Sequence, residues 1–132
     1  MATISAQALL DSSRATLERL TPDTAWTLLS SGEITLVDTR CGEQLESQGT
    51  VPGAIHAPLS VLYWRADPQS DHHDPRISGS ARRIVLLCAH GYSSSLAAAT
   101  LQQMGHAAAT DVVGGFAAWQ EAGLPVEHTT IR

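Results

Sequence analysis

The run Ile84-Val85-Leu86-Leu87-Cys88 constrains the fold of this 132-residue chain more than any other segment. Four consecutive branched aliphatic residues bounded by polar segments are typical of a strand that is covered on both faces, as in the centre of a parallel sheet. Three other segments predict further strands: Ile34–Asp38, Ala54–His56 and Thr110–Val113. Because segments with helical patterns alternate with these strands, the sequence predicts an α/β fold with a mostly parallel sheet and helices on both faces.

The strongest helix signal lies at Thr21-Pro22-Asp23, where Thr21 can cap, Pro22 suits the first helical position, and Gly32 ends the segment. Four other helices are predicted at residues 4–17, about 43–47, about 94–104 and 116–122, and Ser60 is expected to cap another that carries Val61 to Trp64. Residues 66–83 are polar and predict a surface loop. We therefore expect an N-terminal helical extension at 1–17, one domain at 18–128 and a tail at 129–132.

The cationic residues exclude several classes of function. Eight of them stand against thirteen acidic ones, for a net charge of -5, and all eight are arginine. Non-specific nucleic-acid binding needs clustered positive charge, and Schiff-base chemistry or a lysine-containing phosphate loop needs lysine. We expect no nucleic-acid partner.

The first twenty residues contain Asp11 and Glu18 and lack the apolar run of a signal or a membrane span. A cytoplasmic protein without a membrane partner is therefore expected. The two cysteines, Cys41 and Cys88, are too few for a disulfide framework and would both be thiols in a reducing compartment.

Cys88 ends the central strand and is followed by Ala89, His90, Gly91, Tyr92, Ser93 and Ser94, which lead into a helix. If this loop curls around the sulfur, backbone N–H groups and the helix dipole would favour a thiolate or another anion. Gly91 suits a tight turn, and Ser93 or Ser94 can cap the helix and donate to a bound anion. An inert, buried cysteine is the alternative.

Four ordered motifs resemble those of the single-domain rhodaneses, the thiosulfate sulfurtransferases. The active-site loop of that family resembles Cys-x-His-Gly-x-Ser-Ser at 88–94, and its Asp-x-Arg signature resembles Asp38-Thr39-Arg40. Two further stretches are similar to the family pattern: Gly49–Pro58, and Gly114–Trp119 with Gly123-Leu124-Pro125. The motifs cover roughly residues 20–126.

The resemblance implies a five-stranded sheet and a sulfurtransferase that uses no cofactor or metal. Cys88 would attack the outer sulfur of thiosulfate or a related sulfur-containing anion, and a protein or a small thiol would accept the sulfur. Residues 89–94 would bind the substrate, while Asp38 and Arg40 would form a supporting ion pair. This loop departs from many rhodaneses because it carries no arginine or lysine.

Several alternatives stay open. A non-catalytic or relay module that binds a protein partner would have the same fold, whereas a phosphatase of the related fold would need arginine where Ser94 stands. His90 would contact the sulfur or face solvent. Cys41 would serve as a resolving thiol only if it lies near Cys88, and His72-His73 is interpreted as part of a solvated loop rather than a metal site.

Overall fold

The computed structural model describes residues 2–128 and is built around a parallel sheet. Its strands are β1 (Ile34–Asp38), β2 (Ile55–His56), β3 (Arg83–Leu87) and β4 (Thr110–Asp111). They lie in the order β2-β1-β3-β4, and every neighbouring pair is parallel. The predicted α/β class is therefore confirmed, and the aliphatic run at 84–87 lies in a central strand.

The expectation of five strands is wrong for the described residues, since the sheet there has four. At the edge beside β4, Leu20 forms one isolated parallel bridge to Val112. Pairing stops there because Thr21 caps the next helix and Pro22, which lacks an N–H group, is its first residue. Leu20 therefore makes two backbone hydrogen bonds, to Asp111 and Val113, but does not extend into a strand.

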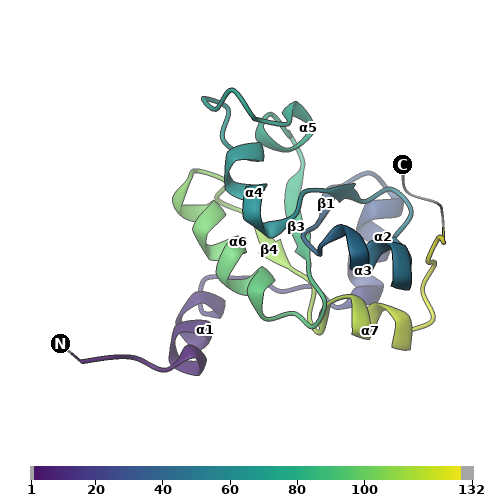
Figure 1. Ribbon diagram of the computed structural model, residues 1–132, viewed down its shortest axis with the longest axis horizontal. Coiled ribbons are helices and arrows are strands. Elements are labelled where there is room, and N and C mark those ends of the chain that lie inside the picture. Colours follow the sequence, from purple (N-terminus) through teal and green to yellow (C-terminus); the bar gives the residue numbers. More distant parts are fainter. Residues whose placement is uncertain (1, 129–132) are drawn as a thin grey trace.

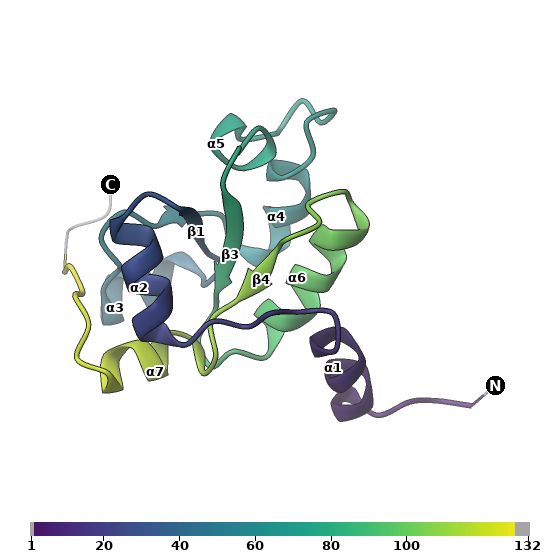
Figure 2. The same ribbon diagram turned by 180° about the vertical axis from the view of Figure 1, so that it is seen from behind.

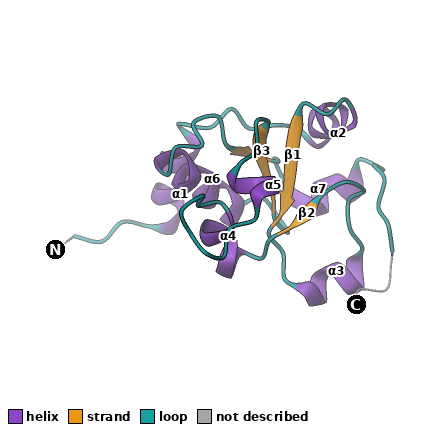
Figure 3. Ribbon diagram, turned by 90° about the horizontal axis from the view of Figure 1, so that it is seen from above, coloured by secondary structure: helices purple, strands orange, loops and turns teal. Residues whose placement is uncertain are grey.

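Helices cover both faces of the sheet (Figure 1). When the molecule is viewed from above, α4 (Leu59–Arg65) and α6 (Ser93–Gln103) lie on one side of the strands, and α2 (Pro22–Ser30) and α7 (Gly115–Glu121) on the other (Figure 3). The remaining helices are α1 (Ala6–Arg14), α3 (Gly42–Gln48) and α5 (Pro75–Ser78). From behind, the chain between α1 and α2 passes over α6 and β4 (Figure 2).

The sheet divides the core into two clusters. Alternate residues of β3 point to opposite faces: Ile84 and Leu86 pack with α4, α5 and α6, whereas Val85 and Leu87 pack with α2 and α7. The whole of β1 and residues 84–87 of β3 are buried. Because both faces are covered, the open position in this architecture is the edge where the strands end.

The helix signals had mixed outcomes. The Thr21 hydroxyl accepts a hydrogen bond from Thr24 N at 3.2 Å, which confirms the predicted cap. The prediction for Ser60 is wrong, because α4 begins at Leu59 after Pro58. The predicted loop at 66–83 contains α5, and its last residue belongs to β3.

The tail predicted at 129–132 lies outside the described residues. Of the helices that the structure does describe, none is long and apolar enough to span a membrane.

Candidate active site

Cys88 directly follows β3, at the edge of the sheet where β1 also ends. Asp38 is in register with Leu87, and Thr39 N donates to Leu87 O at 2.8 Å. The Cys88 residue is 5% exposed. The topology therefore brings Cys88 and the Asp38 motif to the same edge of the sheet.

The loop after Cys88 turns back toward the sulfur. Gly91 adopts a positive φ of 81°, and its N–H donates to Cys88 Sγ over 3.1 Å. A Cβ at this position would lie 2.7 Å from Gly114 N, so a side chain would meet both strain and a backbone clash. Glycine thus allows the amide to approach the sulfur, in agreement with the predicted role of Gly91.

Ser94 contributes a hydroxyl to the sulfur instead of a helix cap. Its Oγ lies 3.1 Å from Cys88 Sγ and donates to Asp111 Oδ2 at 2.7 Å. The prediction that Ser93 or Ser94 caps α6 is wrong, because Tyr92 occupies the N-cap position and no side chain makes a cap hydrogen bond there. Ser93 and Ser94 are the first two residues of α6, after the N-cap position, where their polar groups can face the loop.

The pKa of the Cys88 thiol lies below its ordinary value. Burial raises this pKa, because the charged form loses solvation. Hydrogen bonds from the side chain and backbone of Ser94, the hydroxyl of Ser93 and the backbone of Gly91 lower it by more. The loop therefore favours a thiolate without any cationic group of its own.

Asp111 is a buried carboxylate that the sequence analysis missed. It is fully buried at the end of β4 and accepts hydrogen bonds at 2.7 Å from Ser94 Oγ and Ser95 Oγ. The only signal was an acidic residue within a short segment that was otherwise expected to form a buried strand.

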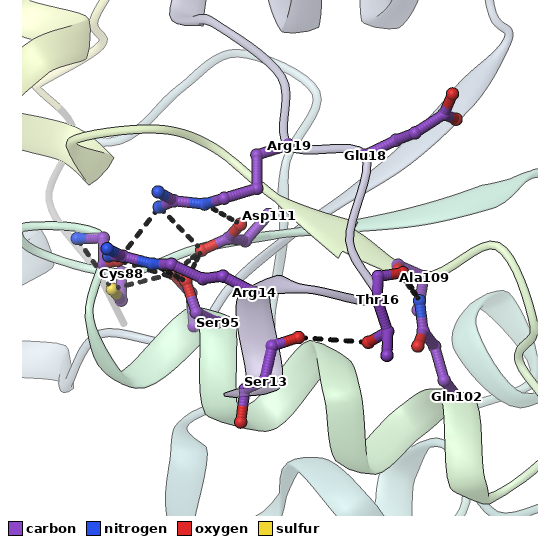
Figure 4. Close-up of polar contacts among 12 residues, drawn as sticks. Ser13, Arg14, Thr16, Glu18, Arg19, Cys88, Ser95, Gln102, Ala109 and Asp111 are labelled. Atoms are coloured by element: carbon purple, nitrogen blue, oxygen red, sulfur yellow. Dashed lines mark hydrogen bonds and ion pairs between the residues drawn. The ribbon is translucent and has the colours of Figure 1, made fainter. Parts of the chain in front are cut away.

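Two arginines from the N-terminal segment also reach this site, and neither was predicted to (Figure 4). Arg14 and Arg19 donate to the Gly91 carbonyl oxygen at 2.7 and 3.0 Å. Arg19 also forms an ion pair with Asp111, with Nε 2.8 Å from Oδ1. Positive charge absent from the loop itself is thus supplied from residues far away in the sequence.

The other loop residues are placed as follows. The Ala89 carbonyl accepts from Ala117 N at 3.0 Å, and the Cys88 carbonyl accepts from Phe116 N at 2.8 Å, so the loop is held on the N-terminus of α7. His90 is exposed, in agreement with the solvent-facing alternative. Tyr92 is 62% exposed, and the Arg14 guanidinium carbon lies 5.8 Å from the centroid of the Tyr92 ring.

Asp38 and Arg40 form the predicted ion pair, with Arg40 Nη2 2.7 Å from Asp38 Oδ2, and both side chains are buried. Arg40 also donates to Gly49 O at 2.9 Å and lies over the Phe116 ring, 3.7 Å from its centroid. These contacts tie the end of β1 to the segment before β2 and to α7.

Cys41 is exposed and lies within 3.5 Å of Gln44 Oε1. His72 and His73 lie exposed in the loop between α4 and α5. Residues 2–128 contain no group of three histidine, cysteine or acidic side chains that is placed to hold a metal ion.

Known proteins with similar sequences place this geometry in a family. Residues 21–122 match the Rhodanese-like domain family, and the chain belongs to that family. It is 32% identical to thiosulfate sulfurtransferase GlpE from Actinobacillus succinogenes over 108 residues, which covers 82% of this chain and 88% of GlpE. Relatives at about this identity are sulfurtransferases, which supports sulfurtransferase activity here in general terms.

Solved structures support the same fold. A Rhodopseudomonas palustris protein of unknown function, described as a possible tyrosine phosphatase, is 35% identical and has a TM-score of 0.88, with 96% of this chain and 97% of that chain covered. The polysulfide-sulfur transferase of Wolinella succinogenes is 24% identical with a TM-score of 0.70, and the match covers 92% of this chain and 85% of that chain.

Proposed function

We propose that this protein moves a sulfane sulfur from thiosulfate or a related donor to a nucleophilic acceptor through a persulfide on Cys88. The observation that carries this proposal is the polar cradle around one sulfur: the Gly91 N–H at 3.1 Å and the Ser94 hydroxyl at 3.1 Å. Such a cradle stabilises an anionic sulfur in a site that is largely closed to water. Sulfurtransferase relatives such as GlpE support the same assignment.

In the first step, the Cys88 thiolate attacks the outer sulfur of thiosulfate. A bond forms between Cys88 Sγ and that sulfur, the sulfur–sulfur bond of thiosulfate breaks, and its electron pair leaves with sulfite. The persulfide then carries the negative charge that the thiolate carried before. In the second step the acceptor attacks the outer sulfur of the persulfide and regenerates the Cys88 thiolate.

The loop supports both steps because the Gly91 N–H already donates to the sulfur and the Ser94 hydroxyl lies within hydrogen-bond distance of it. Gly91 N–H and Ser94 Oγ–H can bind the thiolate in the free enzyme and the charge of the persulfide in the intermediate. Ala89, His90, Tyr92 and Ser93 form the rest of the proposed substrate-binding loop. Asp38 and Arg40 are assigned a supporting role, since their charges are buried against each other and against Phe116.

Phosphatase activity is disfavoured, although one structural relative is described as a possible tyrosine phosphatase. That chemistry needs an arginine fork to clamp phosphate oxygens, and the position that would supply it in this loop is Ser94. Arg14 and Arg19 do not replace it, because both already donate to the Gly91 carbonyl.

The test is to incubate the protein with thiosulfate, remove the excess donor and count added sulfur atoms by intact mass spectrometry. The parent and a Cys41→Ser variant should each gain one sulfur, whereas Cys88→Ser should gain none. A Cys88→Ser variant that loads as well as the parent would show that the assigned nucleophile is wrong. Loss of loading in Cys41→Ser alone would move the nucleophile to Cys41.

The second step, transfer of sulfur to the acceptor, distinguishes a catalyst that acts on small molecules from a relay module that serves a protein partner. A catalyst for small molecules turns over steadily with thiosulfate and cyanide and follows ping-pong kinetics. A relay module would show little turnover with cyanide but would take up sulfur rapidly from a persulfide-bearing partner protein.

A further inference from the structure

The N-terminal segment contacts the Cys88 loop at the Gly91 carbonyl. The N–H of Gly91 donates to Cys88 Sγ, while its carbonyl accepts from Arg14 Nη2 at 2.7 Å and from Arg19 Nη2 at 3.0 Å. Two charge-assisted hydrogen bonds on one carbonyl hold that residue more firmly than neutral bonds would. The arginines therefore fix the residue that delivers the backbone amide to the sulfur.

A second path runs from Arg19 to the sulfur through side chains, and Figure 4 shows its contact between Arg19 and Asp111. Arg19 binds Asp111 with Nε at 2.8 Å from Oδ1 and Nη2 at 3.2 Å from Oδ2. Asp111 Oδ2 accepts from Ser94 Oγ, which contacts Cys88 Sγ. Arg14 joins the same network, because its Nε donates to Ser95 Oγ at 3.1 Å.

The single proton of the Ser94 hydroxyl gives this path a chemical consequence. When Cys88 is a thiol, its S–H donates to Ser94 Oγ and the Ser94 proton goes to Asp111. When Cys88 is a thiolate or a persulfide, Ser94 must turn its proton to the sulfur, and Asp111 loses one donor. Asp111 keeps Ser95 and Arg19, so its buried carboxylate stays satisfied in both states.

Arg19 has an electrostatic effect as well. The Asp111 side chain is fully buried, and an uncompensated carboxylate one hydroxyl away from Cys88 would oppose a thiolate. The guanidinium of Arg19, whose side chain is only 17% exposed, offsets that charge. The other charged or titratable groups near the loop are Arg14, the exposed His90, and the Asp38–Arg40 pair, which is neutral as a unit.

We propose that Arg14 and Arg19 are positioning residues for Cys88. Both arginines hold the Gly91 N–H against the sulfur, and Arg19 binds Asp111, so that the Ser94 hydroxyl is free to donate to the sulfur. Arg14 lies within the segment predicted as an extension, and both arginines precede residue 21, where the match to the family begins. The N-terminal segment thus completes the site. The inference deepens the proposed function and rests on it for its catalytic meaning.

The test compares Arg19→Gln and Arg14→Gln with Arg76→Gln, all in a Cys41→Ser background so that only one thiol titrates. Arg76 is a matched control, since it also binds an aspartate, Asp74, but is 66% exposed and lies on α5. The readout is the ultraviolet absorbance of the Cys88 thiolate against pH, which needs no substrate. Because alkylation rate mixes thiolate fraction with nucleophilicity, the midpoint is the safer quantity.

We expect the Cys88 midpoint to rise by about one pH unit in Arg19→Gln, a tenfold fall in the acid-dissociation constant of the thiol, and by less in Arg14→Gln. Arg76→Gln should keep the parental midpoint. A folded Arg19→Gln variant with a parental midpoint would overturn the proposal.

A double variant, Arg19→Gln with Asp111→Asn, covers the case in which the single variant fails to fold. It removes both members of the pair, so no buried charge is left unpaired and the midpoint should return toward the parental value. The double variant retains Ser94. If it folds and its Cys88 midpoint lies far above that of the parent, the proposal that Arg19 acts by compensating the charge of Asp111 is contradicted. If the midpoints behave as expected while no variant or parent loads sulfur, the proposed function fails and the positioning role stands.

Discussion

Gly115 is the position at which one added methyl group should disturb the active-site loop most directly. It is the first residue of α7 and has a φ of 61°. A Cβ there would overlap the Cys88 carbonyl oxygen and lie 2.7 Å from Gly91 N and 2.8 Å from the Ala89 carbonyl carbon. All three are backbone atoms of the loop, so none can swing aside as the tip of a side chain does.

The size of the effect follows from a comparison with Gly123. That residue has a similar φ of 70°, but an added Cβ would meet nothing within 4 Å. Gly123→Ala should therefore show only the cost of a left-handed alanine, about 1–2 kcal/mol. Gly115→Ala carries the same cost plus overpacking of about 1–3 kcal/mol, for a total of about 2–5 kcal/mol. The reduced freedom of the unfolded chain is common to both variants and cancels in the difference.

The assay is urea unfolding of parent, Gly115→Ala and Gly123→Ala, together with sulfur loading of the folded protein. We expect Gly115→Ala to unfold at the lowest urea concentration and to load sulfur more slowly, because relief of the overlap must move Cys88 or Gly91. Gly123→Ala should load at the parental rate. Equal stability of the two variants, with parental loading in both, would contradict the predicted overlap at Gly115.

Three other predictions follow from the same geometry. Ser94→Ala should raise the Cys88 pKa and slow sulfur loading about tenfold or more at neutral pH, because the thiolate loses one hydrogen-bond donor. Ser95→Ala leaves the sulfur contact in place and should change the pKa and the loading rate less. pH profiles of sulfur loading measure both effects. Folding lowers the pKa of Cys88, so the thiolate should stabilise the folded parent relative to Cys88→Ser. This stabilisation should be complete above the pKa of Cys88 in the unfolded chain and should disappear as the pH falls through the pKa in the folded protein. Urea unfolding of both proteins across pH checks the direction of the change. Asp38→Asn leaves the Arg40 charge buried without its partner and should cost about 3–5 kcal/mol; a loss below about 1 kcal/mol in urea unfolding would contradict the burial argument.

Local signals were enough to predict the strands and the edge at which the site lies. The aliphatic run at 84–87, the Thr21 cap and the glycine-rich loop after Cys88 each depend on residues close together in the sequence. Parallel topology then places strand ends together, which brought Cys88 and Asp38 to one edge. The count of five strands failed because one bridge at Leu20 does not make a strand.

The detailed polar surroundings of the sulfur depended on contacts that no local pattern reports. Whether Ser94 caps a helix or faces Cys88 changes with a shift of one or two residues in the start of α6. That degree of precision is beyond what capping preferences provide.

Local sequence patterns were sufficient to predict an α/β sheet with a cysteine loop at the end of its central strand, because apolar periodicity, caps and turn residues act over a few neighbours. Tertiary packing alone explains why Arg14 and Arg19 both bind Gly91 and why Arg19 binds Asp111, over separations of 72 to 92 residues in the chain. Their meeting depends on α1 packing against α6 and on β4 bringing Asp111 beneath the loop. Burial of a carboxylate with its partner charges is a property of that packing, since only there does water stop competing for the same groups.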